Sequence, residues 1–162
     1  MTLSRRTVLL SLASVMTAAQ KSNAAGPTVV VSKDPNCDCC RAWAEHLRTS
    51  GFAVELRDVT DLGAVKTRLG VPSDLAACHT AEVGGYVIEG HVPASAIKRL
   101  LRERPSGKGL AVPGMPVGSP GMEVPRAEPE EYTVVLFGLG RRDYARFKGG
   151  QEIVAAAPKP AR

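Results

Sequence analysis

The chain has 162 residues, of which 44% are hydrophobic and 23% are charged. These values predict one globular domain whose modest core does not need disulfide bonds for its stability. The formal net charge is +5, but no basic patch interleaved with aromatic residues is present, so nucleic acid is not an expected partner. The four cysteines are therefore free to carry chemistry.

Residues 1–25 have the layout of a signal peptide. Arg5 and Arg6 precede an uncharged stretch, and small residues follow before Gly26. The paired arginines before a mildly hydrophobic run fit the twin-arginine type, and the run is short for a membrane span. We expect an exported, periplasmic protein with no stable membrane association after cleavage. A retained N-terminal anchor helix is the alternative.

Strand and helix signals alternate along the first half of the remaining chain. A β-branched run at 28–34 predicts a buried strand, and a helix at 39–51 follows it. The apolar face of this helix carries Cys40, Trp43 and Leu47. Residues 52–59 alternate as a half-buried strand does, and 61–70 form a short helix with a capping aspartate and a terminal glycine.

The second half predicts a hairpin, a helix, a long loop and a strand. Two glycines at 84–85 join two short strands in a tight turn. An amphipathic helix covers 94–104, and the Pro- and Gly-rich segment 105–131 cannot form a regular element. Such long loops are generally functional or disordered. We expect the last strand at 132–139 and a flexible tail at 149–162.

This order of elements predicts an α/β domain over residues 26–148. The first two strands, joined through a helix, form a right-handed parallel βαβ unit. Together with the antiparallel hairpin and a further helix, they predict a thioredoxin-like fold with a central mixed sheet, flanking helices and a Gly/Pro-rich loop before the last strand. The cysteines then lie at the first strand–helix junction, where redox sites of this fold occur.

Three cysteines, Cys37, Cys39 and Cys40, lie where this first helix begins. We expect Asn36 or Asp34 to cap the helix, which places the sulfurs over its first turn. The unpaired N–H groups and the helix dipole there favour thiolate over thiol. A thiolate is both the nucleophile of disulfide exchange and a soft metal ligand, so position alone leaves both functions open.

The spacing of the cysteines favours a metal cluster. Cys37 and Cys40 could act as a redox pair, but Cys39 would then be a surplus thiol. Three thiolates within one turn instead suit a site in which sulfur bridges more than one metal ion. Cys78, just before the hairpin, could approach them. Structural disulfides are the alternative, although closing such short loops stabilises little.

Histidine and methionine residues add soft and borderline ligands. His79 and His91 flank the hairpin and are candidate ligands, since imidazole suits copper or zinc. His46 lies about two helical turns beyond the first cysteines, which predicts that it does not bind the metal. Met115 and Met122 lie in the Gly/Pro loop rather than on an apolar stripe. Thioether prefers Cu(I), so the ligand set favours copper, with a zinc site as an alternative.

Several motifs also resemble the exported, thioredoxin-like metal-binding family that includes the copper-resistance proteins of the CopG type. They are "CDCC" after a strand, "CHT", "GGYVIEGHVPA", "GLAVPGMPVGSPGME" and the final strand, from Thr28 to Phe137. The resemblance implies a thioredoxin-like domain whose cysteines help to hold a multinuclear copper cluster with a redox role. The positions that match the family's cysteines and methionines are Cys37, Cys39, Cys40, Cys78, Met115 and Met122.

We therefore expect a periplasmic copper-binding protein of copper tolerance, with a multinuclear Cu(I) cluster held by thiolates with Met and His help. Copper or thiol redox activity would make it an oxidoreductase, which the sequence leaves open. The expected partners are copper ions and other periplasmic copper-handling or efflux proteins. One alternative is a metal-free thiol–disulfide oxidoreductase with Cys37 and Cys40 as its catalytic pair, for which Cys39 and Met115 would not matter. Another is a non-catalytic copper carrier.

Overall fold

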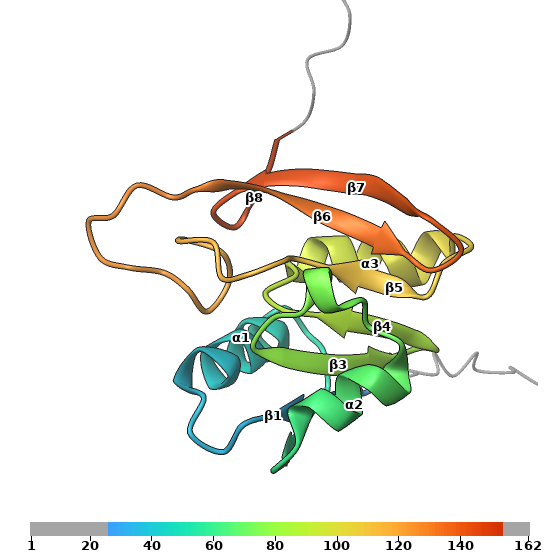
Figure 1. Ribbon diagram of the computed structural model, residues 1–162. Helices are drawn as coiled ribbons and strands as arrows, with labels where there is room; N and C mark the ends of the chain where they lie inside the picture. The colour runs from blue at the N-terminus through green and yellow to red at the C-terminus, as the bar shows by residue number, and fades with distance from the viewer. Residues whose placement is uncertain (1–25, 154–162) are drawn as a thin grey trace, which may run out of the picture.

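The computed structural model describes residues 26–153, which form a mixed α/β domain (Figure 1). Three α-helices and one eight-stranded mixed sheet make up this part of the chain. The strands lie in the order β2-β1-β3-β4-β5-β6-β7-β8. No helix within the described range is long and apolar enough to cross a membrane. The predicted leader at 1–25 lies outside the described residues.

The first three elements form the predicted parallel β–α–β unit. β1 (Val29–Lys33) pairs in parallel with β2 (Val54–Asp58), and α1 (Asp38–Thr49) connects the two strands. One stripe of α1 is buried, as its apolar spacing predicts. The buried stripe consists of Cys40, Trp43, Ala44 and Leu47.

The second helix and the hairpin also form where the sequence predicts them. α2 (Leu62–Leu69) begins after Asp61, whose carboxylate caps the helix. A short 3-10 turn, η1 (Ser73–Leu75), leads to β3 (His79–Val83), which pairs antiparallel with β4 (Tyr86–Glu89). The two glycines of the turn have φ angles of 56° and 89°, which glycine adopts at little cost in two-residue hairpin turns.

Helices cover both faces of the sheet. α1 and α3 (Ala94–Glu103) pack on one face, where Trp43 and Ile97 belong to the main hydrophobic core. α2 covers the other face, where Leu69 and Phe137 belong to a smaller cluster. Because successive side chains of a strand point to opposite faces, Val87 and Ile88 of β4 belong to different clusters.

The C-terminal half contains more strands than the sequence predicts. β5 (Gly109–Ala111) lies inside the segment expected to be irregular, and it pairs in parallel with β4 and antiparallel with β6 (Glu131–Phe137). The prediction that β6 is the last strand is wrong, because β7 (Arg141–Lys148) and β8 (Gln151–Glu152) follow it. The Gly/Pro-rich loop therefore precedes the antiparallel β6–β7–β8 ladder rather than a single final strand.

The sequence does not predict β7 as a strand, because its residues, RRDYARFK, are mostly charged. Only Ala145 and Phe147 are buried in it, and all of its charged side chains are exposed. The backbone hydrogen bonds to β6, rather than apolar content, define this strand. Part of the expected tail, Gln151–Glu152, extends the sheet as β8, and residues 154–162 lie outside the described range.

Candidate metal centre

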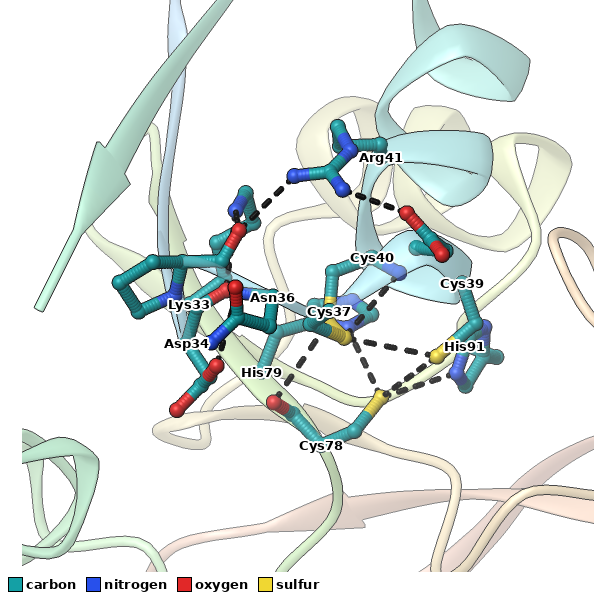
Figure 2. The surroundings of a disulfide bond; sticks show 12 residues. Lys33, Asp34, Asn36, Cys37, Cys39, Cys40, Arg41, Cys78, His79 and His91 are labelled. Atoms are coloured by element: carbon teal, nitrogen blue, oxygen red, sulfur yellow. Dashed lines mark hydrogen bonds and ion pairs between the residues drawn. A yellow bond between two sulfur atoms is a disulfide. The ribbon is translucent and has the colours of Figure 1, made fainter.

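The sheet topology brings two distant cysteine segments to one edge. β1 and β3 are antiparallel neighbours in which Lys33 pairs with His79. The end of β1 therefore lies beside the start of β3, and the segments that continue from them, 34–40 and 76–78, meet. The cysteine cluster forms there (Figure 2). It consists of Cys37, Cys39, Cys40 and Cys78, whose sulfurs all lie within 4.8 Å of one another.

A cysteine caps the first turn of α1. The Sγ of Cys37 accepts a hydrogen bond from the Cys40 N–H at 3.3 Å. The prediction that Asn36 or Asp34 is the cap is therefore wrong, because the Asp34 carboxylate instead accepts from the Asn36 N–H at 2.8 Å, within the preceding loop. One N–H of the first turn of α1 therefore points at sulfur, in the electrostatic environment that favours a thiolate once the disulfide is reduced.

Cys37 and Cys40 form a disulfide, while Cys39 and Cys78 are free thiols. The Cys39 sulfur lies 3.5 Å from that of Cys37 and 3.8 Å from that of Cys78. In this state only Cys39 and Cys78 can become thiolates. A two-electron reduction would return Cys37 and Cys40 to the set of available ligands, so the number of thiolates depends on the redox state.

Two buried histidines extend the cluster on the side of Cys78. The Cys78 sulfur lies 3.0 Å from Nε2 of His91 and 3.3 Å from Nδ1 of His79. These three residues form a second group whose ligand atoms lie within 4.8 Å of one another. Cys78 therefore belongs both to the cysteine cluster and to the Cys78–His79–His91 group.

The His91 ring is already oriented as a ligand. Its Nδ1 lies 2.8 Å from the carbonyl oxygen of Pro120, and a carbonyl can only accept, so Nδ1 carries the proton. Nε2 then presents its lone pair toward the Cys78 sulfur. A backbone carbonyl that fixes the tautomer in this way is the usual outer partner of a metal-binding histidine.

His79 has an unpartnered nitrogen in the protein interior. The side chain is fully buried between Trp43, whose ring centroid is 4.3 Å away, and His91 at 5.1 Å. Among the described residues, its Nε2 has no hydrogen-bond partner. An unsatisfied buried polar atom is costly, and a bound ion is one of the partners that would satisfy it. The donor set thus fits a soft or borderline metal ion.

Burial shifts the pKa values of these groups in the direction that favours their neutral forms. It raises the pKa of the Cys78 thiol to about 12, and the neighbouring Cys39 adds to the shift. It lowers the pKa of His91 and lowers that of His79 well below its ordinary range. At neutral pH Cys78 therefore keeps its proton and both imidazoles are uncharged. A cation bound here would displace the Cys78 proton, because its positive charge would stabilise the thiolate that burial disfavours.

The Gly/Pro-rich loop lies against the site. Gly121 has a φ of 83°, and a Cβ at this position would stand 2.7 Å from the Cys39 carbonyl oxygen and 2.6 Å from the Trp43 nitrogen. Only glycine permits this approach, which also brings the Pro120 carbonyl to His91. Met122 directly follows, and its N–H donates to the Ser119 carbonyl at 2.7 Å.

The two methionines differ in position. Met122 is half-buried beside the segment that touches α1, whereas the Met115 side chain is 53% exposed. His46 belongs to neither ligand group, and its Nε2 accepts a hydrogen bond from the Ala94 N–H at 3.1 Å, where α3 begins.

Sequence reasoning missed the role of a buried lysine. Lys33 is only 2% exposed, and its ammonium group contacts the Asp58 carboxylate at 2.6 Å. It also donates to the carbonyls of Asp34 at 2.9 Å and Pro35 at 3.3 Å. These bonds shape the loop that leads into the cysteine cluster. A charged residue at the end of an otherwise apolar strand was the available signal.

Comparison with known proteins places this chain in a family. A family model described as "Protein of unknown function, DUF411" matches residues 75–122. Among curated proteins, none matches the chain.

Two solved structures, both of copper resistance protein CopG, are similar to it with 44% sequence identity. Form 2 has a TM-score of 0.71 and is matched over 75% of this chain and 98% of its own. Form 1 has a TM-score of 0.70, with 76% and 99% covered. With this identity over nearly their full length, the chain belongs to the family of the copper resistance protein CopG.

Proposed function

We propose that the protein is an exported copper-binding protein of copper tolerance. The observation that carries the proposal is the convergence of four sulfurs and two imidazole nitrogens at Cys78. The ligands would be the four residues of the cysteine cluster with His79 and His91. Met122, and the more exposed Met115 after movement of the loop, would complete the set.

The donor atoms favour copper over zinc. Thiolate, imidazole and thioether together suit Cu(I), whereas thioether is not among the usual zinc ligands. Because Cys78 belongs to both ligand groups, one thiolate can serve two neighbouring metal positions, which supports a multinuclear cluster. The similarity to copper resistance proteins at 44% identity points to the same metal.

Redox chemistry and copper binding would be linked through the Cys37–Cys40 disulfide. Its reduction takes up two electrons and two protons and frees two thiols for the metal. The same disulfide favours a second candidate function, a thioredoxin-like thiol–disulfide oxidoreductase that works without metal. The parallel βαβ unit with the disulfide at its strand–helix junction supports the thioredoxin-like assignment.

Export through a twin-arginine signal at 1–25 would place the protein in the periplasm. There it would exchange copper ions with other copper-handling or efflux proteins. The resemblance in sequence motifs and the Arg5-Arg6 pair support this part of the proposal. A chain without redox turnover would act as a copper carrier in the same compartment.

An anaerobic titration of the reduced protein with Cu(I) against a competing chelator tests the proposal. We expect more than one tightly bound copper per chain, with the four thiols protected together from alkylation. His91→Gln should weaken binding at least tenfold, while the matched control His46→Gln, whose ring lies outside the cluster, should not. No tight copper together with a Cys37–Cys40 disulfide that exchanges readily with other thiols would favour the metal-free oxidoreductase instead.

A further inference from the structure

Glu89 is a fully buried carboxylate at the end of β4, two residues before His91. A carboxylate in the protein interior is costly unless it is paired and hydrogen-bonded. Its Oε1 accepts from the Ala77 N–H at 2.6 Å and from the Lys66 ammonium group at 2.5 Å. Its Oε2 accepts from the Thr80 hydroxyl at 2.7 Å. The carboxylate is therefore satisfied by three donors from other parts of the chain.

These donors flank the centre of the metal site. Ala77 directly precedes Cys78, and Thr80 directly follows His79. The Glu89 carboxylate is therefore hydrogen-bonded to the residues on both sides of the Cys78–His79 pair. The next residue, Gly90, adds a bond from its N–H to the His79 carbonyl at 3.1 Å. A Cβ on Gly90 would stand 2.7 Å from the Ala77 side chain, so the two segments are in close contact.

We propose that Glu89 is a positioning residue of the metal site. Its carboxylate holds the backbone around Cys78 and His79, and thereby keeps the Cys78 sulfur within reach of Cys39 and His91. The copper part of this inference rests on the proposed function, whereas the placement of the Cys78 thiol does not. The competing explanation is that Glu89 only neutralises Lys66, whose side chain is 14% exposed.

Two double variants separate positioning from neutralisation. Lys66→Met with Glu89→Gln removes both charges but keeps an oxygen for the Ala77 N–H and an amide group beside the Thr80 hydroxyl. Lys66→Met with Glu89→Met removes the same charges and also both hydrogen bonds. Because the two variants carry the same charge, any difference between them reports the hydrogen bonds on either side of Cys78.

The first measurement needs no metal. With Cys37, Cys39 and Cys40 replaced by serine, the alkylation rate of Cys78 reports how well its thiol is held in the half-buried position. We expect the Glu89→Met variant to react at least fivefold faster than the Glu89→Gln variant. Equal rates in two folded variants would overturn the inference. A purely structural role would lower the melting temperature while leaving this rate unchanged at temperatures where both are folded.

The second measurement is Cu(I) affinity in the reduced chain with all cysteines present. We expect binding at least tenfold weaker with Glu89→Met than with Glu89→Gln, and equal affinities would also overturn the inference. If Glu89→Met does not fold, Thr80→Val is added to the Lys66→Met and Glu89→Gln variant instead. This removes one of the two flanking bonds at the same charge, and the same criteria apply. If the unaltered protein binds no copper tightly, the proposed function fails, and the alkylation rates still decide the role of Glu89.

Discussion

Replacement of Gly121 by alanine tests how the loop packs against α1 beside the candidate metal site. The new Cβ would stand 2.6 Å from the Trp43 nitrogen and 2.7 Å from the Cys39 carbonyl oxygen. Both are backbone atoms of α1, which cannot rotate away, so the loop itself must move. That movement would withdraw the Pro120 carbonyl from Nδ1 of His91, 2.8 Å away.

The cost of this change has two parts. A non-glycine residue in the left-handed region costs roughly 1–2 kcal/mol. Loss of the hydrogen bond between Pro120 and His91 costs about 1 kcal/mol more. We therefore expect Gly121→Ala to lower the free energy of unfolding by about 2–3 kcal/mol, since the strain and the lost bond act on the same segment.

Urea unfolding of the metal-free protein, followed by Cu(I) titration, measures both effects. Gly150→Ala is the matched control, because a Cβ there meets no atom within 4 Å and the residue lies outside the left-handed region. Copper affinity should fall for Gly121→Ala and stay unchanged for Gly150→Ala. Equal stability and affinity in the two variants would refute the close approach of the loop to α1 and its role in orienting His91.

Three further predictions concern the histidines, the shared cysteine and the tryptophan of the site. Burial holds the pKa of all three histidines below the ordinary 6.5, so below about pH 6.5 the unfolded chain binds more protons than the folded one. The urea concentration at the midpoint of unfolding of the metal-free protein should therefore be highest above pH 6.5 and fall as the pH drops to 5. A midpoint that does not change with pH would contradict the burial argument. Cys78→Ser should weaken Cu(I) binding at least tenfold more than His91→Gln, because Cys78 belongs to both ligand groups; equal losses in chelator competition would argue against a shared thiolate. Trp43→Phe loses the 2.9 Å bond from Nε1 to the Val92 carbonyl and should cost about 1–3 kcal/mol in urea unfolding, because that buried oxygen is left without its partner; an unchanged midpoint would show that the bond is dispensable.

Local patterns in the sequence were sufficient for the first half of the fold. The β-branched run, the apolar stripe of α1, the Asp61 cap and the two-glycine turn each depend on neighbouring residues, and all were confirmed. Patterns of this kind arise from interactions between residues that are close in sequence. The C-terminal strands lack such patterns, because β5 and β7 form through pairing with β4 and β6 rather than through apolar periodicity.

The candidate site likewise has features that depend on local sequence and features that depend on long-range pairing. The candidate donor atoms could be read from the sequence, since the spacing of Cys37, Cys39 and Cys40 and the soft donors elsewhere already favoured copper. Which of these groups meet depends on how the strands pair. The antiparallel pairing of β1 with β3 places Cys78 beside the first three cysteines, and the burial of His79 and His91 brings their nitrogens to its sulfur. The types of the candidate ligands are evident from the sequence itself, but their proximity depends on the register of strands that are distant in sequence.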